Sequence, residues 1–426
     1  MTEISAAGNI RRDRYNFIFA MFLAVTALLM LLYEVFGVDH FIGYIDGEAY
    51  YSYLPEYFLD GNWEHFEKYP IGTAVCELPF FAVAHLLTLL TDSAAADGYT
   101  EMYDWSVGIS GIFFYVLGTM VLYRVLRRMT GGKRALFVCF LMTIGTALPV
   151  YATKYASFSH IKTYALTAIL IYLVLRIVEE EDAFRNNFLL GLVAGLLVII
   201  RNINVFFLLF YLLYGFGRGK IWREHLKNVF SLRRLAPNIL GGLLMVLPQM
   251  ILWKIATGDF LCYSYEDEAF TYLANPKLYE VFFSDAKGLL VFSPILIFGI
   301  IGLFFLGRVE SGKYTAGIVA VFALETYTTA AWWCWWLGGV YSIRSFVDIF
   351  PFFAIAMAAF FGWLSERLRE RTRAVRIGME LFYGAMLIFF ALVNFAFYKG
   401  TQTGVVNETM AFWWELREAL QQVFVF

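Results

Sequence analysis

Long apolar runs separated by short polar connections make up most of this chain of 426 residues. A helix that crosses a membrane needs about 20 mainly apolar residues. About 11 runs meet that requirement, at residues 15–36, 105–126, 135–153, 160–178, 187–201, 203–217, 236–256, 288–306, 314–332, 347–364 and 377–398. The pattern therefore predicts an all-α polytopic membrane protein with about 11 transmembrane helices.

A further apolar segment, at 71–90, follows Pro70 and is interrupted by Glu77, Pro79 and His85. We interpret it as a re-entrant or interface-lying helix. The cytoplasmic loops of membrane proteins carry most of the Lys and Arg residues. With a cytoplasmic N-terminus and no span at 71–90, the predicted cytoplasmic loops hold more than two thirds of the 33 Lys and Arg residues. A span at 71–90 would move most of the later basic loops to the other side.

This topology predicts one transmembrane domain, 1–398, with large external loops at 37–104 and 257–287. It also predicts an external tail, 399–426, whose apolar residues recur at the spacing of an amphipathic helix lying on the membrane. The sequon Asn407-Glu408-Thr409 in the tail is too short a motif to carry weight. We expect a cytoplasmic N-terminus and an external or periplasmic active site. The compact form favours the bacterial inner (plasma) membrane.

Composition agrees with residence in a membrane. The chain is 60% hydrophobic and 16% charged, with a mean hydropathy of +0.63, whereas soluble domains are roughly half apolar and a quarter charged. No basic tract indicates nucleic-acid binding. The cysteines, Cys76, Cys139, Cys262 and Cys334, show no zinc or redox spacing. We interpret them as small buried residues, with a disulfide as the alternative.

Residues able to do chemistry gather at the predicted external ends. The stretch Ile45-Asp46-Gly47-Glu48-Ala49-Tyr50-Tyr51 follows the first span, and Glu67-Lys68-Tyr69-Pro70-Ile71-Gly72 comes shortly after. Ionisable groups near a bilayer are costly and are therefore functional candidates. A carboxylate can take a proton from an acceptor hydroxyl, while cations stabilise a leaving phosphate. We predict that Asp46 is a general base of this kind.

The other candidates fall into two groups. The predicted ligands of a donor phosphate are cationic or imidazole side chains, namely Arg344, Arg201, Lys154 and His160. The predicted lining of the substrate cavity is Glu48, Tyr50, Tyr51, Lys68, Tyr69, Tyr265, Trp336 and Asp348. No confident metal site is predicted. A divalent cation at Asp46 and Glu48 stays open as an alternative, although it would need oxygen ligands from elsewhere.

These candidates also have structural alternatives. Asp46 suits the N-cap of a helix. Arg201 and Arg344 lie at span ends, where long side chains reach toward lipid headgroups. His160 is otherwise the start of a helix, and the tryptophans of 332–336 suit an interfacial belt.

Several of these segments together resemble the GT-C fold glycosyltransferases, a group that includes protein O-mannosyltransferases and the lipid A aminoarabinose transferase. The resemblance runs through Asp46, Lys68-Tyr69-Pro70-Ile71-Gly72, Ser159-His160, Arg201-Asn202-Ile203-Asn204, Tyr263-Ser264-Tyr265, Lys287-Gly288 and Trp336-Leu337-Gly338-Gly339 to Arg344-Ser345-Phe346-Val347-Asp348. It implies a polyprenyl-phosphate-linked sugar donor, a cavity facing away from the cytoplasm, and inversion at the anomeric carbon with Asp46 as base. In place of an Asp-x-Asp or Asp-Glu pair, this first loop carries Asp46-Gly47-Glu48.

The sequence thus predicts a membrane glycosyltransferase that acts on a glycan, lipid or protein acceptor. Two other classes stay open. A lipid-linked sugar flippase would need charged groups along a path through the membrane, whereas these gather at one side. A non-catalytic membrane subunit of a glycan-assembly complex would tolerate the loss of Asp46.

Overall fold

A computed structural model describes residues 2–37, 42, 45–91, 95–179, 183–285, 287–402 and 417–421, and these contain helices but no strands. The α-helices are α1 Thr2–Gly37, α2 Ile45–Tyr51, α3 Tyr53–Phe58, α4 Gly72–Thr91, α5 Glu101–Thr130, α6 Gly132–Gly145, α7 Leu148–Ala152, α8 His160–Glu179, α9 Ala183–Ile200, α10 Leu209–Leu212, α11 Lys220–Val229, α12 Leu232–Thr257, α13 Leu278–Phe283, α14 Leu289–Phe292, α15 Ile297–Gly302, α16 Thr315–Ala331, α17 Phe350–Arg369 and α18 Arg373–Gln402. Short 3₁₀ helices are η1 Asn202–Leu208, η2 Pro294–Leu296, η3 Leu303–Arg308, η4 Glu310–Gly312 and η5 Arg344–Ile349.

The predicted all-helical membrane fold is confirmed. Within the described residues, seven helical segments are long and apolar enough to cross a membrane by length and composition, and four shorter apolar helices accompany them. The predicted span 135–153 forms α6 and the five-residue α7, separated by an extended residue at Thr146. In contrast α4, which the sequence predicts to be re-entrant or interface-lying, is one of the seven.

The contacts of α4 nevertheless keep it at one end of the bundle. Asn16 in α1 accepts a hydrogen bond from Arg127 in α5 at 2.6 Å, and the ring of Phe19, later in α1, stacks on that of Tyr123, earlier in α5. The two helices therefore run antiparallel. A full crossing by α4, between these two helices in the chain, would reverse α5 and separate Asn16 from Arg127. Instead, His85 near the end of α4 lies 2.7 Å from the Tyr103 hydroxyl at the start of α5, and Gly72 at the start of α4 packs against the last turn of α9.

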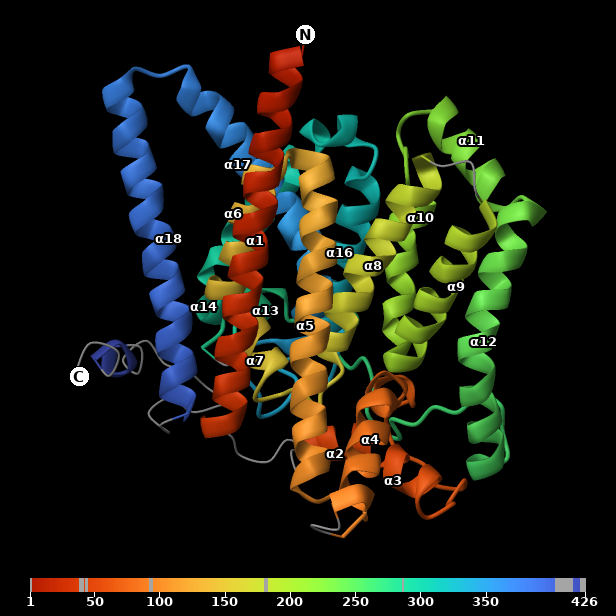
Figure 1. Cartoon of the computed structure of the whole chain (residues 1–426). Coiled ribbons are helices and arrows are strands. Elements are labelled where there is room, and N and C mark those ends of the chain that lie inside the picture. Colours follow the sequence, from red (N-terminus) through yellow and green to blue (C-terminus); the bar gives the residue numbers. More distant parts are fainter. Residues whose placement is uncertain are drawn as a thin grey trace.

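The basic loops meet at the end where α1 begins. Arg128 pairs with Glu179, which links the ends of α5 and α8. Arg308 pairs with Glu366 at 3.1 Å, which links η3 to α17. We call this the N-terminal end and the opposite one the α2 end; they are the upper and lower ends of the molecule in Figure 1. The basic residues of these loops therefore share one end of the molecule, away from α2.

Two helical segments form the interior of the bundle. The segment Arg344–Arg369, which is η5 with α17, is 94% buried over its most apolar window, and α8 is 78% buried. The corresponding fractions for α12, α18 and α1 are only 17%, 28% and 22%, as expected for helices that face lipid. Close packing helps to enclose α17, because a Cβ atom on Gly302 of α15 would lie 2.0 Å from the Ala356 carbonyl oxygen. The interior segments begin at the α2 end, with His160 and Arg344.

The predicted tail helix falls mostly outside the described residues. Only residues 417–421 of the tail are described beyond the end of α18, and they are helical. The sequon at 407–409 lies outside the described residues.

Candidate functional site

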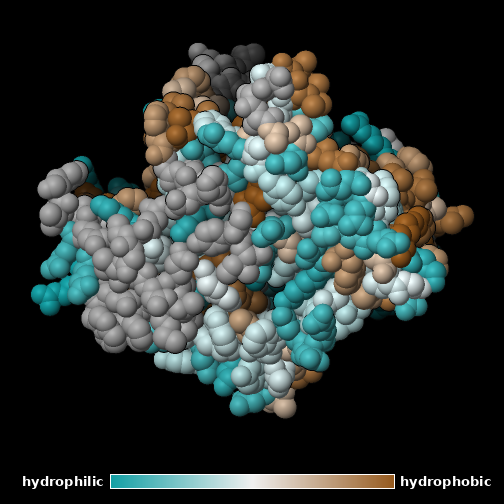
Figure 2. All heavy atoms as spheres, turned by 90° about the horizontal axis from the view of Figure 1, so that it is seen from below, coloured by the Kyte–Doolittle hydropathy of each residue, from teal (hydrophilic) through white to brown (hydrophobic). Residues whose placement is uncertain are grey.

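At the α2 end, three separate parts of the chain converge on the starts of α8 and η5. The first loop supplies Asp46 and Tyr50, the turn before α8 supplies Phe158, and the end of α9 supplies Arg201. Seen from this end, hydrophilic side chains spread from the middle of the face to its right-hand and lower parts, and hydrophobic surface is most extensive along the upper and right-hand edges (Figure 2). The convergence places polar side chains together at one end of the helical bundle.

The centre of the site is an ion pair between Asp46 and Arg344, which joins Oδ2 of the carboxylate to Nη1 of the guanidinium. Both side chains stay partly accessible, at 18% and 15% exposure. The guanidinium carbon also lies 5.3 Å from the ring centre of Phe158, in cation–π geometry. Asp46 is inside α2, which begins at Ile45, so its carboxylate contacts Arg344 from the first turn of the helix.

This pairing controls the ionisation of Asp46. Burial raises the pKa of the carboxyl, but the charge of Arg344 and hydrogen bonds from Arg344 and Tyr69 outweigh burial. The pKa of Asp46 therefore lies below its ordinary value of 3.8. Asp46 is a carboxylate at neutral pH, the form that a general base requires.

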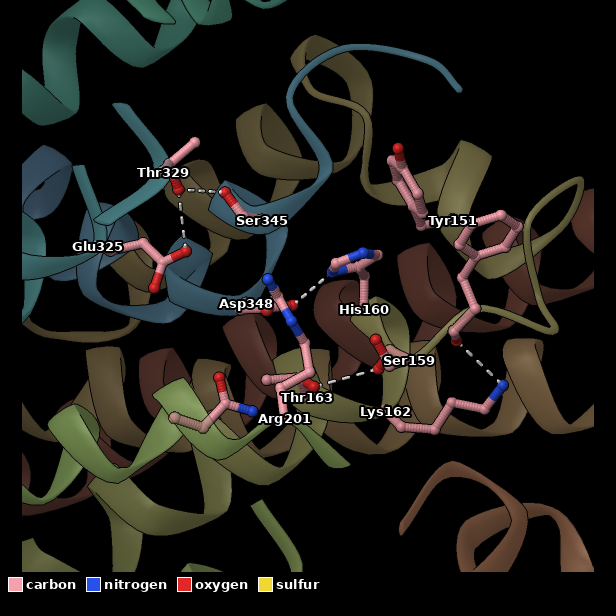
Figure 3. Close-up of polar contacts among 12 residues, drawn as sticks. Tyr151, Ser159, His160, Lys162, Thr163, Arg201, Glu325, Thr329, Ser345 and Asp348 are labelled. Atoms are coloured by element: carbon pink, nitrogen blue, oxygen red, sulfur yellow. Dashed lines mark hydrogen bonds and ion pairs between the residues drawn. The ribbon is translucent and has the colours of Figure 1, made fainter. Parts of the chain in front are cut away.

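A second group of charges lies deeper, around Asp348 in η5. The Asp348 carboxylate is fully buried and bridges two partners: Oδ1 lies 2.8 Å from Nδ1 of His160, and Oδ2 accepts a hydrogen bond of 2.5 Å from Arg201. Figure 3 shows the carboxylate between these two side chains. His160 is 2% exposed and Arg201 is 19% exposed, so Arg201 is the more accessible member of the group.

Three tyrosines surround the Asp46–Arg344 pair. Tyr50 stacks on Tyr69 with ring centres 4.2 Å apart, and Tyr69 meets the ring of Tyr265 edge-on at 6.0 Å. Burial raises the pKa of each of these hydroxyls, so all three stay protonated at neutral pH. Lys68 lies over Tyr265 and pairs with Glu268, which ties the first loop to the 257–277 loop. The site is therefore walled by hydrogen-bond donors from two loops.

The other predicted site residues make different contacts. Tyr51 donates to the Gly98 carbonyl at 2.5 Å and packs inside the first loop, while Glu48 is exposed. Lys154 lies over the ring of Tyr155 at 5.5 Å, and Trp336 packs edge-on against its neighbour Trp335. The structure brings together Asp46, Tyr50, Tyr69, Lys68, Tyr265 and Arg344 around one pair, and His160, Arg201 and Asp348 in the other group.

Two charged groups behind the site were not among the predicted site residues. Glu77 of α4 and Lys162 of α8 form a fully buried pair with Nζ and Oε1 2.5 Å apart. Glu325 of α16 accepts a hydrogen bond from Thr329, whose hydroxyl also lies 2.8 Å from that of Ser345 (Figure 3). In the sequence Glu77 is visible only as an interruption of an apolar segment, and nothing near Glu325 marks its partners.

Ser52, His65 and Glu67 also lie together in the first loop. The Ser52 hydroxyl is 2.9 Å from Nε2 of His65, but the nearest Glu67 oxygen faces the same Nε2 atom, at 3.6 Å. In a catalytic triad the acid orients the histidine through its other nitrogen. Ser52 is also buried. These residues therefore form a structural contact in the loop and not a nucleophile for acyl transfer.

The described residues include no group of three or more His, Cys, Asp or Glu side chains arranged to hold a metal ion. Asp46 is engaged by a guanidinium, whose charge repels a cation, and Glu48 points to the surface. The two acids thus do not fit a divalent-cation site as they stand.

Comparison with known proteins gives structural neighbours only. No protein-family profile matches the chain, and no curated protein sequence matches it. The structure is similar to that of ArnT from Cupriavidus metallidurans bound to undecaprenyl phosphate, with a TM-score of 0.55 and 14% identity over 96% of this chain and 74% of that one. The apo structure of ArnT gives the same TM-score and identity over 94% of this chain and 64% of that one.

A second neighbour is the archaeal oligosaccharyltransferase AglB from Archaeoglobus fulgidus, in complex with an inhibitory peptide and a dolichol-phosphate. It has a TM-score of 0.53 and 13% identity over 88% of this chain and 55% of that one. This chain is therefore an integral membrane protein with the GT-C fold, as the resemblance in sequence implied. At these identities the likeness establishes the fold alone.

We predict that Asp348→Asn destabilises the protein strongly, because it leaves the Arg201 guanidinium without its buried counter-charge. Breaking a buried ion pair costs about 3–5 kcal/mol. The matched control is Glu366→Gln, which breaks the Arg308 pair at 52% and 59% exposure and should cost at most about 1 kcal/mol. Thermal unfolding in detergent measures both. Equal changes in midpoint would show that Asp348 does not act as the buried counter-charge of Arg201.

Proposed function

We propose that this protein is an inverting membrane glycosyltransferase. It transfers a sugar from a polyprenyl-phosphate-linked donor to the hydroxyl of a glycan, lipid or protein acceptor. The observation that best supports this is the partly accessible Asp46–Arg344 pair at one end of a GT-C fold. A base and a phosphate-binding cation in contact are the two groups that such a transfer requires. The neighbouring ArnT and AglB structures, which contain undecaprenyl phosphate and a dolichol-phosphate, support the choice of donor.

The reaction is a single displacement at the anomeric carbon. The acceptor oxygen forms a bond to that carbon as its proton passes to the Asp46 carboxylate. The bond between the anomeric carbon and the phosphate oxygen breaks, and the polyprenyl phosphate leaves with the electron pair. Attack from the face opposite the phosphate inverts the configuration. No covalent intermediate on the protein is needed, which agrees with the absence of a suitably oriented nucleophile in the Ser52, His65 and Glu67 group.

The cations stabilise the negative charge that develops on the phosphate. Arg344 is the first ligand by position, since it is already beside the base and its guanidinium carries donors beyond Nη1. Arg201 is the second, because it is partly accessible and is oriented by Asp348. Lys154 and His160 are further ligands in this proposal, with Nε2 the free ring nitrogen of His160 once Nδ1 meets Asp348. A divalent cation has no role in these steps, given the surroundings of Asp46.

The sugar and acceptor lie among the tyrosines in this proposal. Tyr50, Tyr69 and Tyr265 offer ring faces for stacking and protonated hydroxyls for hydrogen bonds. In this proposal the protein lies in a bacterial inner membrane. Its site faces the external or periplasmic side, and its N-terminus lies on the cytoplasmic side. Supporting this orientation, the basic loops gather at the N-terminal end, away from the site.

We expect Asp46→Asn to lower the rate of transfer by about 10²–10⁴-fold, because it removes the general base. The assay is transfer from a panel of radiolabelled polyprenyl-phosphate sugars by purified protein in detergent or liposomes. Asp60→Asn is the matched control, an exposed acid in the same loop. An unchanged rate in the Asp46 variant would contradict the assignment of Asp46 as the general base. Counterflow of the lipid-linked sugar with no bond cleavage in either protein would favour a flippase.

The acid limb of the pH–rate profile should move to higher pH in Arg344→Gln. The base works in its ionised form, so activity rises with pH through the Asp46 pKa. Burial raises the pKa of Asp46, and the charge of Arg344 is the largest influence that lowers it. Removing the guanidinium should therefore raise this pKa. Arg308→Gln, at an exposed position of the N-terminal end, serves as the control and should leave the limb in place. A limb that stays put in Arg344→Gln would mean that Asp46 is not the titrating base.

The cysteines provide a test of sidedness. Cys262 and Cys334 lie at the α2 end and are partly exposed, whereas Cys76 and Cys139 are buried. A membrane-impermeant maleimide should therefore label Cys262 or Cys334 in spheroplasts but not in sealed inverted vesicles. Cys262→Ser and Cys334→Ser identify the labelled site. Labelling confined to inverted vesicles would reverse the proposed orientation.

A further inference from the structure

A buried ion pair behind the site has no part in the reaction outlined above. Lys162 lies in the first turn of α8 with no exposed side-chain surface, and Glu77 of α4 is 1% exposed. Their Nζ and Oε1 atoms are 2.5 Å apart. The two residues connect the first-loop helix α4 to an interior helix of the bundle.

Lys162 also holds the turn that precedes α8. Its ammonium group donates to the backbone carbonyl of Ala156 and to that of Phe158, the latter at 3.3 Å. An ammonium has three donors, and in this position each meets an acceptor: two carbonyls of the turn and the Glu77 carboxylate. The turn is therefore fixed through its own backbone by one buried side chain.

The same turn carries residues that touch the proposed catalytic groups. The Phe158 ring supports the guanidinium of Arg344 at 5.3 Å. The next residue, Ser159, donates from its hydroxyl to that of Tyr50 at 3.4 Å. A displacement of this turn would move the Phe158 ring and with it the guanidinium of Arg344. Because Arg344 is paired with Asp46, the carboxylate would be affected as well.

Stability alone does not account for this pair. Oε2 of Glu77 has no hydrogen-bond partner within the described part of the chain. Replacing a buried ion pair by apolar residues of similar volume is often neutral or stabilising. In this pair one carboxylate oxygen of Glu77 has no hydrogen-bond partner among the residues that the structure describes, whereas all three donors of Lys162 have acceptors, two of them in the turn. The pair is therefore better suited to fixing the turn than to stabilising the fold.

We propose that Lys162 and Glu77 are positioning residues, which hold the Phe158–Ser159 turn against Arg344 and Tyr50 and so keep Arg344 beside the base. The inference rests on the proposed function, since it assigns them to the same reaction. Neither residue touches the substrate. Their effect is carried by the turn and by Phe158.

The test is the double variant Glu77→Leu/Lys162→Met, which removes both charges at similar volume. It removes the donor of the Ala156 and Phe158 carbonyls, so the thermal midpoint should fall. Below that midpoint the folded variant should lose about 10–100-fold in the rate of transfer, the scale expected for misplacement of a catalytic group by about 1 Å. The acid limb of its pH–rate profile should move upward, as in Arg344→Gln. The exposed pair provides the control, and Arg308→Gln/Glu366→Gln should change neither rate nor limb.

Phe158→Leu is the second variant, because it removes the ring under Arg344 and leaves the backbone acceptors of Lys162 in place. It should shift the limb in the same direction, and it decides the question if the double variant does not fold. An unchanged rate and limb in a folded double variant, or in Phe158→Leu when the double variant is unfolded, overturns the positioning role. Failure of the wild type both to bind a polyprenyl phosphate and to transfer sugar overturns the proposed function itself.

Discussion

The cost of burying charge governs the α2 end of this protein. Removing an ion from water costs several kcal/mol even after relaxation, so a buried charge needs a partner of opposite sign and further hydrogen bonds. The structure meets this need with three pairings: Asp46 with Arg344 at 15–18% exposure, the buried Asp348 with His160 and the partly accessible Arg201, and Glu77 with Lys162 at 0–1% exposure. The accessible pair lies where chemistry is proposed, and the buried groups lie behind it.

The partners in these ion pairs are far apart in the chain, so the site can form only when distant helices have packed together. His160 and Asp348 are separated by 188 residues, and Lys162 and Glu77 by 85. The site is therefore assembled only after α4, α8, α9 and η5 have packed together. Both α8 and η5–α17 begin at the α2 end and lie in the interior of the bundle, so packing against the surrounding helices sets the positions of the residues at their starts.

The sequence predicted what depends on local pattern. Apolar runs identified the helices, and the distribution of basic residues gave the alternation that the Asn16–Arg127 contact supports. The sequence could not show which of two adjacent residues, such as Tyr50 and Tyr51, faces the site. Successive positions of a helix differ by about 100° in direction, and only the packing shows which side of the helix faces the site. The partners of Asp348 and of Lys162 were equally hidden, because an ion pair between distant segments leaves no mark on the residues around either member.

The Asp46–Arg344 contact has a consequence for the proposed reaction. The same guanidinium that would receive the phosphate is the main reason that the pKa of Asp46 stays low. A phosphate bound to Arg344 brings its own negative charge, which offsets that of the guanidinium and makes the carboxylate a stronger base. Proton transfer to Asp46 would then be favoured only when the sugar donor is bound. Without its phosphate, the charge of Arg344 keeps the Asp46 carboxylate a weak base toward an acceptor hydroxyl. Keeping Arg344 against Phe158, at a fixed distance from Asp46, is what allows one side chain to serve both groups.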